Sequence, residues 1–208
     1  MTEEIKIFTS FTTSNCYIVR PFNDNVCFFI DLPPDLEPAL EYVKKNNLSI
    51  GGAFVTHGHY DHSLGMEKFK YPIFINLEDE FLARNPQEQI KSLLSDEVNI
   101  NPYSGDLIDI KQIPHNFINV YSNPGHTKGS VSFEFPQNGY VFTGDFVFKE
   151  GIGRTDLFSG SQLEMKNSLI DVFYNFKDDF TVMPGHGSFD KVINIKKNNQ
   201  YIKMMLND

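Results

Sequence analysis

The sequence predicts an α/β protein made of two similar halves, in which helices lie outside two facing β-sheets. The order of the expected elements is the first reason: strands, helix, strand, helix, and then the same succession again. Composition is the second reason, because the 208 residues are 40% hydrophobic and 22% charged, as in ordinary globular proteins. This length allows a sizeable core, and we expect one folded domain over residues 1–208.

The first half of the chain begins with strands. Short runs rich in β-branched and aromatic residues predict strands at 4–9, 16–20, 26–31, 53–56 and 71–76, with a hairpin turn at 23–25. Apolar residues at helical spacing predict helices over 35–47, 62–69 and 77–95, the last of them broken at Pro86.

The second half repeats this succession. Strands are expected at 117–122, 130–135, 139–145 and 180–183, with a tight turn at 137–139 between the second and third. An amphipathic run predicts a helix over 162–176, for which Ser161 is a suitable N-terminal cap. The final helix is expected over 191–207.

The charge balance argues against a nucleic-acid partner. Lys and Arg number 18 against 27 Asp and Glu, so the net charge is −9, and binding to phosphate backbones depends on Lys and Arg.

The acidic N-terminus has no apolar signal segment, and no apolar run approaches the roughly 18 residues of a membrane helix. Cys16 and Cys27 have no metal-like spacing and are expected to pack in the core. A cytoplasmic location fits these features best.

Metal-competent side chains gather just after predicted strands. The stretch "THGHYDH" follows the strand at 53–56, and three later strands are each followed by one such residue. Loops held by a rigid scaffold are where binding groups usually lie. The candidate ligands are His57, His59, Asp61, His62, His126, Asp145 and His186. The sixth histidine, His115, is expected to be an ordinary surface or core residue.

Seven candidate ligands are too many for one ion. Imidazole nitrogens and carboxylate oxygens bind zinc and similar divalent cations, and a catalytic zinc usually takes three protein ligands. We therefore expect two ions. Zinc is the first choice, while His and Asp ligands also accept iron or manganese.

The arrangement resembles the metallo-β-lactamase superfamily, and within it the short glyoxalase II-like hydrolases. The resemblance runs nearly end to end, through "NCYIV", "FFIDLP", "THGHYDH", "NPGHTKGSVSF", "VFTGDFVF", "GIGRTDL" and "PGHG". It implies a four-layer αβ/βα sandwich with the metals at one edge between the sheets. His62 directly after Asp61, and Asp145 where many lactamases have Cys, are typical of the thioesterase, lactonase and nuclease branches rather than of the lactamases themselves.

The resemblance also implies a role for each ligand. His57, His59 and His126 would hold the first metal, Asp61, His62 and His186 the second, and Asp145 would bridge both. A water shared by two cations loses a proton near neutral pH, so hydroxide can attack an acyl carbonyl without a Ser or Cys nucleophile. The expected reaction is hydrolysis of a small thioester, with S-lactoylglutathione as the first candidate.

Two further residues receive expected roles from the resemblance. Asp31 corresponds to the family Asp beside the metal loops, where it would orient a ligand. Arg154 matches a basic substrate-binding position, and a guanidinium can grip a carboxylate; the alternative is a structural ion pair with Asp156. Only 22 residues follow His186, too few for the C-terminal glutathione-binding domain of longer relatives.

Two other activities stay open. A mononuclear iron persulfide dioxygenase would share the fold and "GRTD", and would use His57, His126 and Asp145 as a two-His, one-carboxylate set. A lactonase would share all seven ligands. The oligomeric state does not follow from the sequence.

Overall fold

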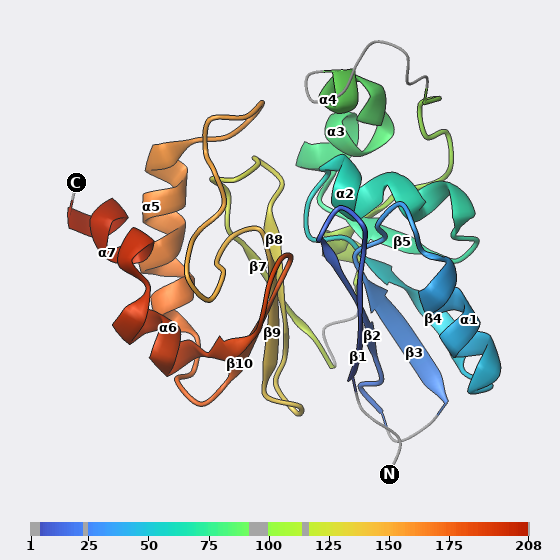
Figure 1. Ribbon diagram of the computed structural model, residues 1–208, viewed down its shortest axis with the longest axis horizontal. Coiled ribbons are helices and arrows are strands. Elements are labelled where there is room, and N and C mark those ends of the chain that lie inside the picture. Colours follow the sequence, from blue (N-terminus) through green and yellow to red (C-terminus); the bar gives the residue numbers. More distant parts are fainter. Residues whose placement is uncertain (1–4, 23–24, 92–99, 114–116, 208) are drawn as a thin grey trace. The chain divides into compact units, whose positions relative to one another are not determined.

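The computed structural model describes residues 5–22, 25–91, 100–113 and 117–207, which form two compact units, 1–113 and 114–208 (Figure 1). Within the described residues, no helix combines the length and the apolar character needed to cross a bilayer. Each unit has its own sheet and its own helices, and each is described by itself.

The first unit is built on a six-stranded sheet with the order β1-β2-β3-β4-β5-β6. Its strands are β1 (Ile5–Thr9), β2 (Asn15–Val19), β3 (Val26–Ile30), β4 (Ser49–Phe54), β5 (Ile73–Ile75) and β6 (Ile108–Asp109). The first three pair antiparallel, whereas β3 to β6 pair parallel. Because Ile30 pairs with Phe54, parallel β3 and β4 end side by side. The segments that follow them, which contain Asp31 and the "THGHYDH" loop, therefore start at the same edge.

Short helices cover this sheet and continue from its strand ends. They are α1 (Glu37–Lys45), α2 (Tyr60–Ser63), α3 (Glu80–Arg84) and α4 (Pro86–Lys91), with 3₁₀ turns η1 (Leu64–Lys68), η2 (Leu77–Asp79) and η3 (Ile110–Gln112). The helix α1 has an acidic first turn and two lysines in its last turn, as the helix dipole favours. It buries Ala39 and Val43 against the core.

The second unit has a five-stranded sheet with the order β11-β10-β9-β8-β7. Its strands are β7 (Asn119–Ser122), β8 (Val131–Phe135), β9 (Tyr140–Gly144), β10 (Thr181–Pro184) and β11 (Asp190–Lys191). Since β8 is antiparallel to both β7 and β9, and β9 is parallel to β10, the strands β7, β9 and β10 run in one direction. Their carboxyl ends therefore meet at one edge, where His126, Asp145 and His186 follow.

Helices α5 (Gln162–Asp171), α6 (Val192–Asn198) and α7 (Gln200–Asn207), with the 3₁₀ turn η4 (Phe173–Asn175), complete the second unit. The predicted cap at Ser161 is confirmed, because its hydroxyl accepts the Glu164 N–H at 3.2 Å.

The predicted final helix over 191–207 is wrong in one respect, since it breaks in two at Asn199. The buried Asn199 side chain donates to the Phe148 and Gly151 carbonyls at 3.1 and 2.9 Å, and accepts the Ile202 N–H at 3.2 Å.

Other boundaries also differ from expectation. The strand β4 begins at Ser49 rather than at residue 53; the prediction began too late because Gly51 and Gly52 have low β propensity. The expected helix over 62–69 is a helical turn followed by a 3₁₀ turn. The break at Pro86 is confirmed, and the short strands β6 and β11 were not expected. Residues 23–24 of the expected turn, residues 92–95 of the expected helix, and His115 lie outside the described residues.

Both cysteines are free and buried, as predicted, and pack in the core of the first unit. Burial raises the pKa of the Cys27 thiol to about 11, against a smaller opposite effect from Arg20. Burial, together with Asp31 and Asp35, raises the pKa of the Cys16 thiol well above its usual value. Both side chains therefore stay neutral and act as small apolar groups.

Candidate metal centre

The first unit places four predicted ligands in one short segment after β4. His57 and His59 lie in the loop, and Asp61 and His62 lie on α2. All three histidines are buried, and their rings are close: the centroids of His57 and His59 are 4.9 Å apart, and those of His57 and His62 are 4.4 Å apart. Neutral imidazole is a common metal ligand, so buried rings this close suit a shared cation.

Asp61 and His62 have the spacing of two ligands on one ion. Oδ2 of Asp61 lies 3.6 Å from Nε2 of His62. This distance is too long for a strong hydrogen bond. It is close to the separation of about 3.4 Å between two ligands that each lie about 2.0–2.1 Å from a tetrahedral zinc.

Asp31 stands behind this pair and fixes the orientation of His62. Just after β3 the Asp31 backbone has a φ of 61°, a left-handed conformation that is uncommon for a residue other than glycine. One carboxylate oxygen accepts the Thr56 N–H at 2.7 Å, and the other lies 2.9 Å from His62 Nδ1. A carboxylate at Nδ1 favours the proton there and leaves Nε2 free to bind a metal.

The hydroxyl of Thr56 extends the same arrangement to His57. It donates to Asp31 Oδ2 at 2.9 Å, so at 3.1 Å it is placed to accept from His57 Nδ1. Both His57 and His62 are thus oriented through Nδ1 by groups that depend on Asp31. The sequence pattern did not single out Thr56, although it directly precedes the first ligand.

In the second unit, Asp145 lies between two histidines. Oδ2 of Asp145 is 3.6 Å from Nε2 of His126 and 3.6 Å from Nε2 of His186. The three residues come from the ends of β7, β9 and β10, at the edge where these strands end together. A carboxylate oxygen that is equally distant from two imidazole nitrogens has the placement that a shared ligand needs.

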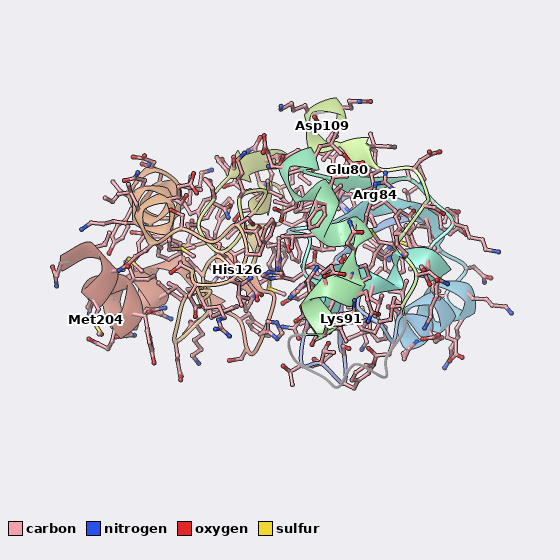
Figure 2. The ribbon with its side chains drawn as sticks, turned by 90° about the horizontal axis from the view of Figure 1, so that it is seen from above. Glu80, Arg84, Lys91, Asp109, His126 and Met204 are labelled. Atoms are coloured by element: carbon pink, nitrogen blue, oxygen red, sulfur yellow. The ribbon has the colours of Figure 1, made fainter. Side chains whose placement is uncertain are left out.

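His126, labelled in Figure 2, is oriented by a backbone group rather than by a side chain. Its Nδ1 lies 2.8 Å from the Arg154 carbonyl oxygen. Gly153 makes this approach possible, because a Cβ there would meet the Asp145 carbonyl oxygen at 1.9 Å and the His126 ring at 2.9 Å. The "GIGRTD" stretch therefore lies directly against two of the predicted ligands.

The Arg154 side chain pairs with Asp156, the alternative that the sequence offered beside substrate binding. Its guanidinium makes a two-pronged ion pair with Asp156, with both distances 2.8 Å. The hydrogen bonds from Arg154 lower the pKa of the Asp156 carboxyl to about 2, and the same pairing raises the pKa of Arg154. Both side chains are exposed, so the pair is screened by solvent.

These two ligand sets fit divalent cations. Their atoms are imidazole nitrogens and carboxylate oxygens, and three of the imidazoles have Nδ1 engaged by an acceptor, so that each presents Nε2. The chain thus carries His/Asp clusters suited to metal binding in both units.

The sequence of this chain matches a known protein family. A sequence model of the metallo-beta-lactamase superfamily matches residues 9–186. The chain belongs to the metallo-beta-lactamase superfamily. Members of this superfamily bind divalent metals, and this chain carries His/Asp clusters that could hold such ions.

Individual relatives in the superfamily cover almost the whole chain. An uncharacterized protein of Mycobacterium tuberculosis is 32% identical over 197 residues, which cover 84% of this chain and 86% of the relative. A hydroxyacylglutathione hydrolase, GloC of Haemophilus influenzae, is 26% identical and covers 97% of this chain and 98% of its own.

Solved structures show the same superfamily fold. The BLEG-1 B3 metallo-beta-lactamase superposes with a TM-score of 0.82 at 21% identity, over 95% of this chain and 99% of that one. TTHA1623 in a di-iron-bound form has a TM-score of 0.77 at 22% identity, over 93% and 98%. ETHE1 from Myxococcus xanthus has a TM-score of 0.70 at 21% identity, over 98% and 90%. The predicted fold class is confirmed, with two sheets and their helices.

Proposed function

We propose that this protein is a dinuclear metal-dependent hydrolase of small thioesters, with S-lactoylglutathione as the first substrate to test. The observation that carries the proposal is Asp145, whose Oδ2 is 3.6 Å from both His126 and His186, together with the adjacent pair Asp61 and His62. We take a carboxylate in this position as a ligand of two ions. GloC, a hydroxyacylglutathione hydrolase with which this chain aligns over nearly its full length, supports the substrate class.

The residues divide into ligands and orienting groups. His57, His59 and His126 are proposed to hold one ion, Asp61, His62 and His186 the other, and Asp145 both. Two such ions would supply a hydroxide nucleophile at neutral pH and polarise the acyl carbonyl.

The protein's own contribution is to hold the ligand atoms in place. Asp31 and the Arg154 carbonyl keep the Nδ1 protons of their histidines, so that Nε2 is presented without rearrangement. In a thioester the leaving thiolate needs little protonation, so the site requires no separate general acid.

The substrate is proposed to be a small molecule rather than a nucleic acid. The net charge of −9 disfavours a phosphate backbone. The ion pair between Arg154 and Asp156 sets a condition on anionic substrates, because a substrate carboxylate must compete with Asp156 for the guanidinium.

The test is metal content measured with thioester hydrolysis on the same preparation. About two zinc-like ions per chain together with turnover supports the proposal. Metal-loaded protein that cleaves no thioester in a panel contradicts it.

An Asp145→Asn variant should lose about 100-fold or more in activity, since a shared ligand loses its charge. Full turnover by that variant would contradict the shared-ligand role.

The second candidate is an iron-dependent persulfide dioxygenase, favoured by the "GRTD" stretch that contacts His126. It would need only His57, His126 and Asp145. One iron per chain with oxygen consumption on a persulfide substrate, and no thioester cleavage, would decide for it. Lactone hydrolysis on the same preparation separates the lactonase alternative.

A further inference from the structure

The loop that carries His57 and His59 is held from behind by two side chains that are not among the ligands. They are Asp79, at the end of η2 and before α3, and Gln89, on α4. In Figure 1 the helices α3 and α4 lie beside α2, at the strand ends of the first unit. Glu80 and Arg84, both on α3 and labelled in Figure 2, form an ion pair at 2.8 Å.

Asp79 holds the first peptide group after His57. It is fully buried, and its Oδ2 accepts the Gly58 N–H at 2.9 Å. The loop packs closely here, since a Cβ on Gly58 would lie 2.7 Å from the Asp79 carbonyl oxygen and from the Leu82 side chain. A buried hydrogen bond to a carboxylate is stronger than one between neutral groups.

Gln89 holds the next two peptide groups. Its Nε2 donates to the Gly58 carbonyl at 3.3 Å and to the Leu82 carbonyl at 2.8 Å. Its Oε1 accepts the Tyr60 N–H at 2.9 Å. A carboxamide has both a donor and an acceptor end, and Gln89 uses both on backbone groups that flank His59.

Together the two side chains bind three successive peptide groups between His57 and Tyr60. The orientation of these peptides sets the directions in which the two imidazoles leave the backbone. We propose that Asp79 and Gln89 are positioning residues, which set the metal affinity of the site that contains His57 and His59. This inference rests on the proposed function only in that these histidines bind a metal; the substrate does not enter it.

The first test compares two substitutions on the same helix, Gln89→Leu and Gln87→Leu. Gln87 is also half-buried and also accepts a backbone N–H, but its partner is Ile100, at 2.7 Å, in a segment far along the chain from the loop. Zinc dissociation constants are measured by competition with a chromogenic chelator. Thermal unfolding of the metal-free proteins is monitored in parallel. We expect Gln89→Leu to weaken one of the two sites about tenfold or more, and Gln87→Leu to leave both sites unchanged.

The second test uses Asp79→Asn and Asp79→Ala, in case one variant does not fold. The Asn amide oxygen can still accept the Gly58 N–H, so we expect it to retain most of the affinity that Ala loses. Wild-type affinity in a folded Gln89→Leu or Asp79→Ala protein would overturn the inference. Wild-type protein that binds two ions but cleaves no thioester would refute the proposed function alone. Wild-type protein that binds no metal would refute both.

Discussion

The Nδ1 atom of His126 lies 2.8 Å from the carbonyl oxygen of Arg154. A backbone oxygen therefore orients one of the proposed ligands, and no side-chain substitution at Arg154 removes it. The contact depends instead on Gly153, which lets the chain pass between His126 and the Asp145 carbonyl.

Substitution of Gly153 by Ala should damage both stability and metal binding. The new Cβ would lie 1.9 Å from the Asp145 carbonyl oxygen, so the backbone must move and displace two ligands. We expect a loss of about 1–3 kcal/mol in unfolding free energy and at least about tenfold weaker metal binding. Gly151→Ala is the matched control, because its Cβ would meet Phe148 at 3.7 Å, an ordinary contact. Equal effects of the two substitutions would contradict this account.

Asp31→Asn should weaken metal binding without changing the set of ligands. The amide has one oxygen and one NH₂ group, so it cannot accept from the Thr56 N–H and from His62 together, as the two carboxylate oxygens do. We expect a loss of about 10–100-fold in metal affinity or activity, measured by chelator competition and steady-state kinetics. Unchanged affinity in a folded variant would show that Asp31 does not orient His62.

Removal of Asp156 should free Arg154 for anionic substrates. We expect Asp156→Ala to lower KM for a thioester that carries carboxylates, and to leave KM unchanged for a neutral thioester. Arg154→Ala should raise KM for the anionic substrate only. If both substitutions affect the two substrates equally, Arg154 does not contact the substrate.

The pH dependence of this pair follows from the lowered pKa of Asp156. Its folded value of about 2 is below the ordinary carboxyl value of 3.8, so the folded state favours the ionised form. Any stabilisation is therefore complete above pH 3.8 and is lost as the pH falls toward 2. An NMR titration of the carboxyl through the acid range should show a midpoint near 2; a midpoint near 4 would mean that the pair is open in solution.

Asn199→Ala should lower stability by about 2–3 kcal/mol. The side chain is buried and makes hydrogen bonds to the backbone of Phe148, Gly151 and Ile202, and the substitution removes all three. Asn198→Ala is the neighbouring control, because Asn198 is exposed. Denaturant unfolding of both variants measures the difference, and similar midpoints would contradict the proposed role.

Much of the architecture was predictable because hydrophobic periodicity and turn residues mark most of its strands and helices. The structure places the seven candidate ligands after strand ends, as expected, because short polar motifs follow buried strands, and parallel strands end together at one edge. That they bind metal is a proposal.

The groups that orient the ligands were harder to predict. Thr56, Gln89 and the Arg154 carbonyl act through contacts that no local pattern marks: a hydroxyl beside a ligand, an amide on another helix and a backbone oxygen. Helix ends were also missed where tertiary contacts decide them, as at Asn199, whose side chain bonds a distant loop.

The burial of both cysteines has a consequence for oxidative stress. Thiols react with peroxide and with alkylating reagents as thiolates, and burial raises the thiol pKa at both Cys16 and Cys27, to about 11 for Cys27. The proposed ligand set contains no sulfur at all, whereas relatives with Cys at the position of Asp145 would present a thiolate there. Peroxide would therefore find no thiolate among the seven proposed ligands, and oxidation of either cysteine would have to begin with partial unfolding that exposes the core.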